Sequence, residues 1–210
     1  MNDPDNNQNN NHSSDGFAST TLVIWDFLKI IIAAIIIIIP IRFFIFQPFI
    51  VSGSSMEPNF YHGEYLVIDE ISYRFGEPAR GQVVVLHPPT ANSKEFYIKR
   101  IVALPEEKVE IDNGKVTIFS SEHPNGMVLK EEYLPNQSLS YPHDPSVVGG
   151  RKILTLKPDE YFVMGDNRLA SSDSRDWGPL PRSEIIGKVF LRALPFRKFQ
   201  VFTQVPEYSF

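Results

Sequence analysis

The chain has 210 residues, enough for one substantial domain and an appendage, and carries a formal net charge of −5. That charge, together with the absence of a basic block, argues against nucleic acid as a partner, because phosphate binding needs clustered lysine and arginine. The chain has no cysteine, which excludes disulfides, thiolate chemistry and cysteine-bound metals. Its five histidines are scattered, with no pair spaced for one helical face, so we expect no metal site and no cofactor.

The N-terminal part of the sequence consists of a polar tail followed by an apolar run. Residues 1–19 are mostly Asn, Asp, Ser and His, which bury too little surface to offset the entropy of ordering, so we predict a disordered tail. The run that follows is richest in isoleucine at Ile30–Ile41. As a helix at about 1.5 Å per residue, Leu22–Phe46 spans roughly 37 Å, enough to cross a hydrocarbon core of about 30 Å. We therefore expect one transmembrane helix at residues 20–47.

Two other interpretations of the apolar run stay open. One is a buried helix of a soluble protein, because the uninterrupted charge-free stretch is only about a dozen residues long. The other is a cleaved signal peptide, since Ser52-Gly53-Ser54 offers small residues like a cleavage site, although nothing before Lys29 is basic. Lys29 and Arg42 flank the run about equally, so the positive-inside bias gives no orientation.

After Phe49 the sequence changes to short alternating apolar runs separated by turn residues, which is the pattern of β-strands. Asp112-Asn113-Gly114 predicts a tight hairpin, because Asn-Gly accepts the positive φ angles of such a turn. Residues 120–150 are rich in proline and predict a long irregular excursion from the sheet. We therefore predict a mainly β, antiparallel, barrel-like domain over residues 48–205. The expected strands are Tyr65–Asp69, Gln82–Leu86, Phe96–Val102, Lys108–Ile111, Val116–Phe119, Ile153–Leu156, Tyr161–Met164 and Ile185–Leu191.

Two adjacent cations interrupt one of these apolar strands. Without cysteine or well-placed histidines, a hydrolytic site would use serine or threonine with another base, which leaves lysine. Lys99 and Arg100 must point to opposite faces of the sheet. If Lys99 is covered, burial lowers its pKa and allows it to act as a general base, which arginine cannot do. The alternative is that a twist or bulge places both cations on the solvated face.

Two polar segments are further candidates for a site. The loop Gly165–Gly178, directly after an apolar strand, has enough donors and acceptors to form a hydrogen-bond network that positions reactive groups. An exposed turn rich in Asx residues is the alternative. The small-residue stretch Val51–Asn59, V-S-G-S-S-M-E-P-N, is either a flexible joint or the location of a nucleophilic serine.

Three segments, in this order and approximate spacing, resemble the motifs of bacterial type I signal peptidases: S-G-S-S-M-E-P-N, Y-I-K-R and M-G-D-N-R-L-A-S-S-D-S-R-D-W-G. The resemblance covers roughly Phe46–Phe190, and the chain looks like the shorter, single-span form of the enzyme. It implies a serine–lysine dyad protease, in which Ser55 is the nucleophile and Lys99 is its general base.

The resemblance also implies supporting roles for other residues. The backbone N–H of Ser55 and a donor at Gly53 form the oxyanion hole. Because Gly53 has no side chain, only its backbone can donate, unless Ser52 or Ser54 contributes. The remaining supporting residues are Ser171, which hydrogen-bonds the lysine, Asp173 and Arg175, which form an ion pair near the site, and Gly165, Asp166 and Asn167, whose role is mainly structural.

Three positions depart from the family pattern. Asn59 stands where threonine is common, Gln82 stands where aspartate is usual, and L-P-E-E at Leu104–Glu107 replaces L-P-G-D. None of these changes removes a member of the dyad, and the last concerns the turn that follows the lysine strand.

By this resemblance, the substrates are secreted preproteins whose signal peptides end in small-x-small residues such as Ala-x-Ala. The enzyme is expected in the plasma membrane as a single-pass protein, with its catalytic domain outside the cytoplasm. Contact with the lipid bilayer is expected from aromatic residues near the span, with packing at the helix end or in the core as the alternative: Phe43, Phe44, Phe46, Phe49 and Phe60.

Two other functions stay open. The first is a catalytically silent, membrane-anchored β module that binds peptides. The second is a serine–lysine protease of the repressor type, which cuts itself or a regulator. The sequence does not determine the oligomeric state.

Overall fold

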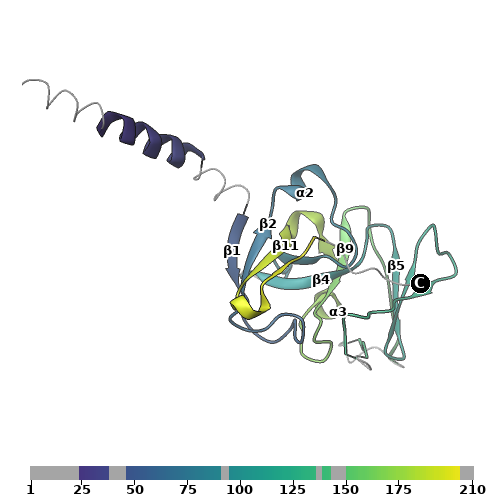
Figure 1. The fold of residues 1–210 in the computed structure, drawn as a ribbon. Helices are drawn as coiled ribbons and strands as arrows, with labels where there is room; N and C mark the ends of the chain where they lie inside the picture. The colour runs from purple at the N-terminus through teal and green to yellow at the C-terminus, as the bar shows by residue number, and fades with distance from the viewer. Residues whose placement is uncertain (1–23, 38–45, 91–94, 136–138, 143–149, 204–210) are drawn as a thin grey trace, which may run out of the picture. The chain divides into compact units, whose positions relative to one another are not determined.

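The computed structural model describes residues 24–37, 46–90, 95–135, 139–142 and 150–203 (Figure 1). The chain divides into two compact units, Met1–Phe43 and Phe44–Phe210. In the first unit the structure describes one helix, over residues 24–37. Within the described residues, no helix combines the length and apolar character needed to cross a membrane. The tail expected at residues 1–19 lies outside the described residues, as do parts of the span expected at residues 20–47.

The β domain begins two residues before the boundary expected from the sequence. Its first strand, β1 (Phe46–Ile50), pairs antiparallel with β2 (Tyr65–Asp69), so Phe46 and Gln47 belong to the sheet and not to a helix. Strand β1 contains Pro48, which cannot donate to a ladder. The sheet tolerates this proline because β1 lies at its edge.

All eight strands expected from the alternating pattern are present, with small shifts at their ends. They are β2, β3 (Val83–Leu86), β4 (Tyr97–Ala103), β5 (Lys108–Asp112), β6 (Lys115–Phe119), β8 (Lys152–Thr155), β9 (Glu160–Met164) and β11 (Ile185–Leu194). The strands that the pattern missed, besides β1, have two residues each and so carry no alternation: β7 (Met127–Val128), β10 (Leu180–Pro181) and β12 (Gln200–Val201). The short helices are α2 (Ser72–Phe75), α3 (Ser174–Trp177) and the 3₁₀ turns η2 (Arg182–Glu184) and η3 (Phe196–Lys198).

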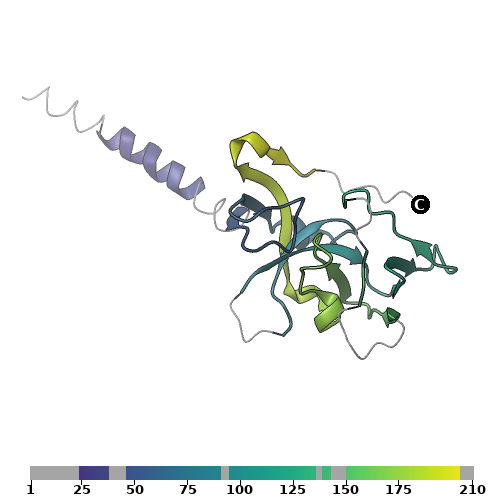
Figure 2. The same cartoon turned by 90° about the horizontal axis from the view of Figure 1, so that it is seen from below.

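The strands form two antiparallel sheets, which confirms the predicted mainly β, antiparallel class. The larger sheet has the order β1-β2-β11-β3-β4-β9-β10, with β12 beside β11, and the smaller has the order β7-β6-β5-β8. Both orders are open, with β1 and β10 at the edges of the larger sheet. Figure 2 shows β11, in yellow-green, curving along its length. Its register shifts against β2 between Val189 and Leu191 and between Arg192 and Leu194, and such bulges bend a strand.

The predicted hairpin joins β5 to β6. Asn113 and Gly114 adopt φ angles of 49° and 78°, the positive values that a tight two-residue turn requires. The excursion predicted at residues 120–150 contains the short strand β7 in its described part, which pairs with β6 and extends the smaller sheet.

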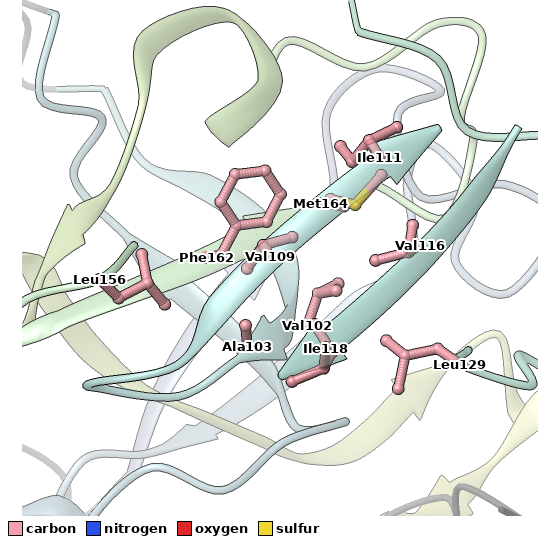
Figure 3. Close-up of a cluster of buried hydrophobic side chains, with 10 residues drawn as sticks. All are labelled: Val102, Ala103, Val109, Ile111, Val116, Ile118, Leu129, Leu156, Phe162 and Met164. Carbon is pink, nitrogen blue, oxygen red and sulfur yellow. The ribbon is translucent and has the colours of Figure 1, made fainter. Parts of the chain in front are cut away.

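A cluster of buried side chains joins the two sheets (Figure 3). Strands β4 and β9 contribute from the larger sheet, and β5 and β6 contribute from the smaller one. The members are Val102, Ala103, Val109, Ile111, Val116, Ile118, Leu129, Leu156, Phe162 and Met164. Close packing of this kind resists displacement, so the cluster holds β4 and β9 in fixed relation. Lys99 lies on the first of these strands, and the polar loop begins where the second ends.

Candidate active site

The two residues expected to form a dyad are in direct contact. The Lys99 ammonium donates a hydrogen bond to Ser55 Oγ over 2.9 Å, although the residues lie 44 positions apart in the chain. Lys99 projects from β4, whereas Ser55 lies in a turn closed by a hydrogen bond from the Glu57 N–H to the Ser54 carbonyl. Met56 and Phe60, both 1% exposed, pack in the core and anchor the turn, so the position of Ser55 is fixed.

Strand β4 buries both of its cations, on opposite faces. Lys99 is 3% exposed and Arg100 is 5% exposed, so the alternative that both lie on the solvated face is wrong. Arg100 donates to both oxygens of the Asp166 carboxylate, over 2.8 and 2.6 Å, and to the Gly81 carbonyl over 2.9 Å. Its guanidinium also lies over the ring of Tyr133, 4.0 Å from the ring centre. These contacts replace the solvation that the arginine loses on burial.

The environment of Lys99 lowers its basicity. Burial is the main cause and lowers the pKa of Lys99 to about 8, because removal from water disfavours the charged ammonium. The nearby carboxylates of Asp173 and Asp166 act in the opposite direction, and the charge of Arg175 adds to the lowering. At a pKa of about 8, the neutral amine that a general base requires is accessible near neutral pH.

Asp173 and Arg175 form the ion pair expected in the polar loop, and neither side chain is exposed. The guanidinium donates to both carboxylate oxygens, over 2.8 and 2.7 Å, and the Gly165 N–H donates to the same carboxylate over 3.0 Å. Burial alone would raise the pKa of Asp173, but the hydrogen bonds and charge of Arg175, with the Gly165 N–H, hold it below its ordinary value. Asp173 also caps helix α3, whose third residue Asp176 completes a capping box.

The polar loop is also hydrogen-bonded to the turn that contains Ser55. The Asn167 backbone N–H donates to the Ser55 carbonyl over 3.0 Å, and the Asn167 side-chain amide donates to the Ser54 carbonyl over 3.1 Å. A Cβ atom on Gly165 would lie 2.4 Å from the Ser55 carbonyl oxygen and 2.2 Å from Ser171 Oγ. Glycine is therefore required at position 165 by the close approach of the two segments.

Ser171 lies beside this contact, but its expected hydrogen bond to the lysine is not formed. The Ser171 side-chain oxygen is buried and has no hydrogen-bond partner among the described residues. Lys99 instead donates its hydrogen bond to Ser55 Oγ. The role of Ser171 as a partner of the lysine stays a prediction.

Sequence reasoning missed Arg168, which ties the excursion to the polar loop. Arg168 is 3% exposed and donates to the Gly165 carbonyl over 3.1 Å. It also forms an ion pair with Glu131 and a hydrogen bond to Ser140, both on the described part of the excursion. The partners lie 37 and 28 positions from Arg168, so no local pattern could have indicated them.

The backbone donor expected from Gly53 is already engaged in a hydrogen bond. The Gly53 N–H donates to Nδ1 of His62 over 3.3 Å. Gly53 has a φ angle of +89°, in the region that favours glycine, and a Cβ there would meet nothing within 4 Å. Glycine is thus needed at position 53 for its backbone angle and not for space.

The three departures from the family pattern are each accommodated by hydrogen bonds. The Asn59 side-chain amide donates to Asp166 and to the Tyr133 carbonyl, over 2.9 Å in both cases. Gln82 accepts from the Tyr73 hydroxyl over 2.6 Å. In the L-P-E-E turn, Glu106 adopts a φ angle of 66°, which glycine would adopt more easily, and Glu107 closes the turn by accepting from the Leu104 N–H over 2.8 Å.

A groove of about 730 Å³ runs past Ser55 and Lys99. The end of β1 and the start of β4 form its walls, where the rings of Phe49 and Phe96 meet edge to face at 5.3 Å. The lining residues are Phe49, Ile50, Val51, Ser52, Gly53, Ser54, Ser55, Leu66, Val85, Glu95, Phe96, Tyr97, Ile98, Lys99, Ala170 and Ser172. The groove is therefore largely apolar along its walls and hydroxyl-rich near the dyad.

The structure corrects one residue expected at the bilayer. Phe60 is 1% exposed and packs against Phe202, with ring centres 5.3 Å apart, so it belongs to the core. Phe49 is half-buried and lines the groove. The side chains of Phe43, Phe44 and Phe46 lie outside the described part of the chain.

Known proteins are similar to this chain over the residues that build this site. The family model described as signal peptidase, peptidase S26, matches residues 24–194. Probable signal peptidase I-2 of Synechocystis is 34% identical over 183 residues, which cover 85% of this chain and 77% of the relative. Signal peptidase I P of Bacillus subtilis subsp. natto is 34% identical and covers 77% of this chain and 84% of the relative. A crystal structure of a signal peptidase I from Enterococcus faecalis V583 is 28% identical and covers 54% of this chain and 97% of that one, with a TM-score of 0.41.

The family match extends over the turn that contains Ser55, strand β4 and the whole polar loop. Two relatives that are each 34% identical cover more than three quarters of the chain. The chain therefore belongs to the bacterial type I signal peptidases, peptidase family S26.

Proposed function

We propose that this protein is a membrane-anchored serine endopeptidase that removes N-terminal signal peptides from exported preproteins. The observation that carries the proposal is the 2.9 Å contact between Ser55 Oγ and the amine of the buried Lys99, beside an apolar groove. Serine is a weak nucleophile unless an adjacent base takes its proton, and a lysine with a lowered pKa is such a base. Relatives with the name signal peptidase I supply the substrate class.

The first chemical step is acylation of Ser55. Neutral Lys99 accepts the hydroxyl proton as Ser55 Oγ attacks the scissile carbonyl carbon, and the carbonyl oxygen becomes an oxyanion. With a pKa of about 8, about one Lys99 in eleven is neutral at pH 7, whereas at the ordinary value of 10.5 the share is about one in three thousand. Burial of Lys99 thus raises the neutral fraction of the lysine at pH 7 by about 290-fold on these values.

The second step completes the cycle. The Lys99 ammonium returns its proton to the leaving amine as the peptide bond breaks, which leaves an acyl ester on Ser55. Water then attacks this ester as Lys99 accepts its proton, and the ammonium returns that proton to Ser55 Oγ as the ester bond breaks and the acid product leaves. The Ser55 N–H is the backbone donor assigned to the oxyanion, and a preorganised donor of this kind is worth about 10²–10³ in rate.

The groove suits an extended peptide. A peptide between the end of β1 and the start of β4 can hydrogen-bond to exposed backbone groups, with alternate side chains entering the wall. The expected readout is cleavage after small-x-small sequences such as Ala-x-Ala. The rings of Phe49 and Phe96 occupy part of the groove wall, an arrangement that supports a preference for small substrate side chains.

The membrane anchor is assigned to the part of the apolar run that precedes β1, with the catalytic domain on the extracytoplasmic side. The length and apolar character of the isoleucine-rich run support this part of the proposal. The absence of cysteine makes it directly testable, because a single cysteine placed at exposed Glu122 should react with a membrane-impermeant thiol reagent on intact cells. A cysteine in the tail, at Asn10, should react only after the cells are opened, and the reverse labelling would overturn the orientation.

Purified full-length protein and a preprotein substrate test the catalytic proposal. We expect the wild type to cleave the preprotein. In Ser55→Ala and Lys99→Ala the cleavage rate should fall by at least about a thousandfold, with an unchanged circular dichroism spectrum. A module that only binds peptides would cut nothing in any form. A protease that cuts only itself or a regulator would be processed without cutting the preprotein. Normal cleavage by either variant would exclude the dyad.

A further inference from the structure

Among the described residues, the backbone at Ser52 and Gly53 makes few hydrogen bonds, whereas the Ser54 carbonyl accepts from the Glu57 N–H and from the Asn167 side chain. Ser52, Gly53 and Ser54 are all exposed, and the left-handed backbone angle of Gly53 is one that glycine can leave at little cost. After Ser55, in contrast, buried Met56 and Phe60 anchor the turn. The bond to His62 Nδ1 is the one hydrogen bond that Gly53 makes within the described residues. This bond therefore fixes the peptide two positions before Ser55.

The imidazole is presented by a segment that is itself well fastened. The Val51 N–H donates to the Glu64 carbonyl over 3.0 Å, and the Gly63 N–H donates to the Val51 carbonyl over 2.9 Å, which places His62 opposite Gly53. The Glu64 carboxylate is 2.8 Å from Arg192 and 3.4 Å from Lys198. His62 thus stands on a rigid support, while the peptide that it holds is intrinsically flexible.

We propose that His62 is a positioning residue for the nucleophile, an inference that rests on the proposed function. Its Nδ1 accepts the Gly53 N–H, with the ring proton on Nε2, and fixes the chain direction into Ser55. This keeps Ser55 Oγ aligned between Lys99 and the scissile carbonyl. His62 does not line the groove, so it acts on the chemical step and not on substrate binding. A displacement of about 1 Å in a reacting group can cost about a hundredfold in rate.

Three substitutions separate the hydrogen bond from the bulk of the ring. In His62→Asn, the side-chain Oδ1 can take the position of Nδ1, whereas in His62→Gln the acceptor lies one bond further out, near the position of Nε2. We expect kcat for preprotein cleavage to fall about tenfold in His62→Ala and His62→Gln with KM unchanged. His62→Asn should restore kcat to within about twofold of the wild type. Equal kcat in all four proteins, or an asparagine variant as slow as the alanine variant, would overturn the proposal.

A second measurement does not depend on activity. Amide proton exchange of Gly53, followed by NMR in full-length Ser55→Ala protein in detergent, should be faster when His62 is also changed to Ala and should return to its original rate with Asn. An exchange rate that does not respond to His62 excludes the positioning bond even if the enzyme is active. Loss of preprotein cleavage in the wild type itself would instead refute the proposed function. If His62→Ala fails to fold, the Asn and Gln pair still decides.

Discussion

Lys99 and Arg100 are buried neighbours on one strand, but they differ in the groups that surround their positive charges. Arg100 faces a carboxylate, a carbonyl and an aromatic ring, and these groups replace its lost solvation. Lys99 has only the hydroxyl of Ser55 as its hydrogen-bond partner among the described residues. The two faces of β4 therefore differ in whether a buried positive charge is neutralised.

The other buried cations follow the arginine pattern. Arg168 pairs with Glu131, Arg175 pairs with Asp173, and the Arg192 guanidinium lies 2.8 Å from Glu64. Within the described residues, Lys99 is the buried cation that lacks an ion pair. A paired charge holds segments together, whereas an unpaired one is destabilised as an ion and becomes a base. The difference separates positions that build the site from the one proposed to react.

The largest expected effect on catalysis comes from replacing Lys99 by arginine. Lys99→Arg should lower kcat/KM for preprotein cleavage by at least about a thousandfold, because arginine stays protonated and cannot accept the serine proton. Arg100→Lys is the matched control. It loses the two-pronged bond to Asp166 but keeps the base, so its kcat/KM should stay within about tenfold of the wild type. Substantial activity in Lys99→Arg would show that titration at position 99 is not needed.

Removal of each charge should change stability in opposite directions. Arg100→Met leaves the buried Asp166 carboxylate without its cation and should cost about 3–5 kcal/mol of unfolding free energy. Lys99→Met removes a destabilised ammonium and should add up to about 3 kcal/mol at pH 7. Thermal unfolding of the full-length protein in detergent measures both effects.

The pH dependence of the added stability in Lys99→Met is a control for its cause. The pKa of Lys99 is about 8 in the folded protein, below its ordinary value of 10.5, so the unfolded chain binds more protons between these two values. Wild-type stability should therefore rise from pH 8 to pH 10.5, and the advantage of Lys99→Met should shrink over the same range. An advantage that is independent of pH would mean that the lysine is not destabilised as an ion.

The pH profile of cleavage should follow the same group. In the proposed mechanism only neutral Lys99 accepts the serine proton, so log kcat/KM should rise with a slope of one up to pH about 8 and level off above it. A fluorogenic peptide with an Ala-x-Ala site provides the measurement. A rate that stays flat down to about pH 5 would contradict lysine as the base.

The smallest effect is expected at Asn59, on the arginine side of the strand. Its amide donates hydrogen bonds to both Asp166 and the Tyr133 carbonyl, so Asn59→Ala should cost about 1–2 kcal/mol in unfolding free energy. Threonine, with a single donor, should recover about half of that cost. In both variants kcat should change less than about threefold, because Asp166 keeps its bonds to Arg100. A fall in kcat of more than about threefold would show that Asn59 affects the reaction itself and not only stability.

Much of the fold could be predicted because its signals are local. Alternation indicated all eight longer strands after β1, and Asn113-Gly114 indicated the hairpin, since period and turn angles depend on neighbouring residues. The strand at Phe46–Ile50 was missed because it contains proline and follows the apolar run without a break. Its strand character comes from pairing with Tyr65–Asp69, which is a long-range contact.

In the candidate site, too, some features follow from local sequence and others only from tertiary packing. The sequence by itself determined that Lys99 and Arg100 are neighbours in an apolar strand, that Gly53 and Gly165 lack side chains, and that lysine was the base available. Only the tertiary structure decided which cation is neutralised, because Asp166 reaches Arg100 across 66 positions and leaves Lys99 to Ser55. It also decided that the Gly53 N–H meets His62. Burial and charge pairing arise when distant segments pack together, and no local pattern encodes them.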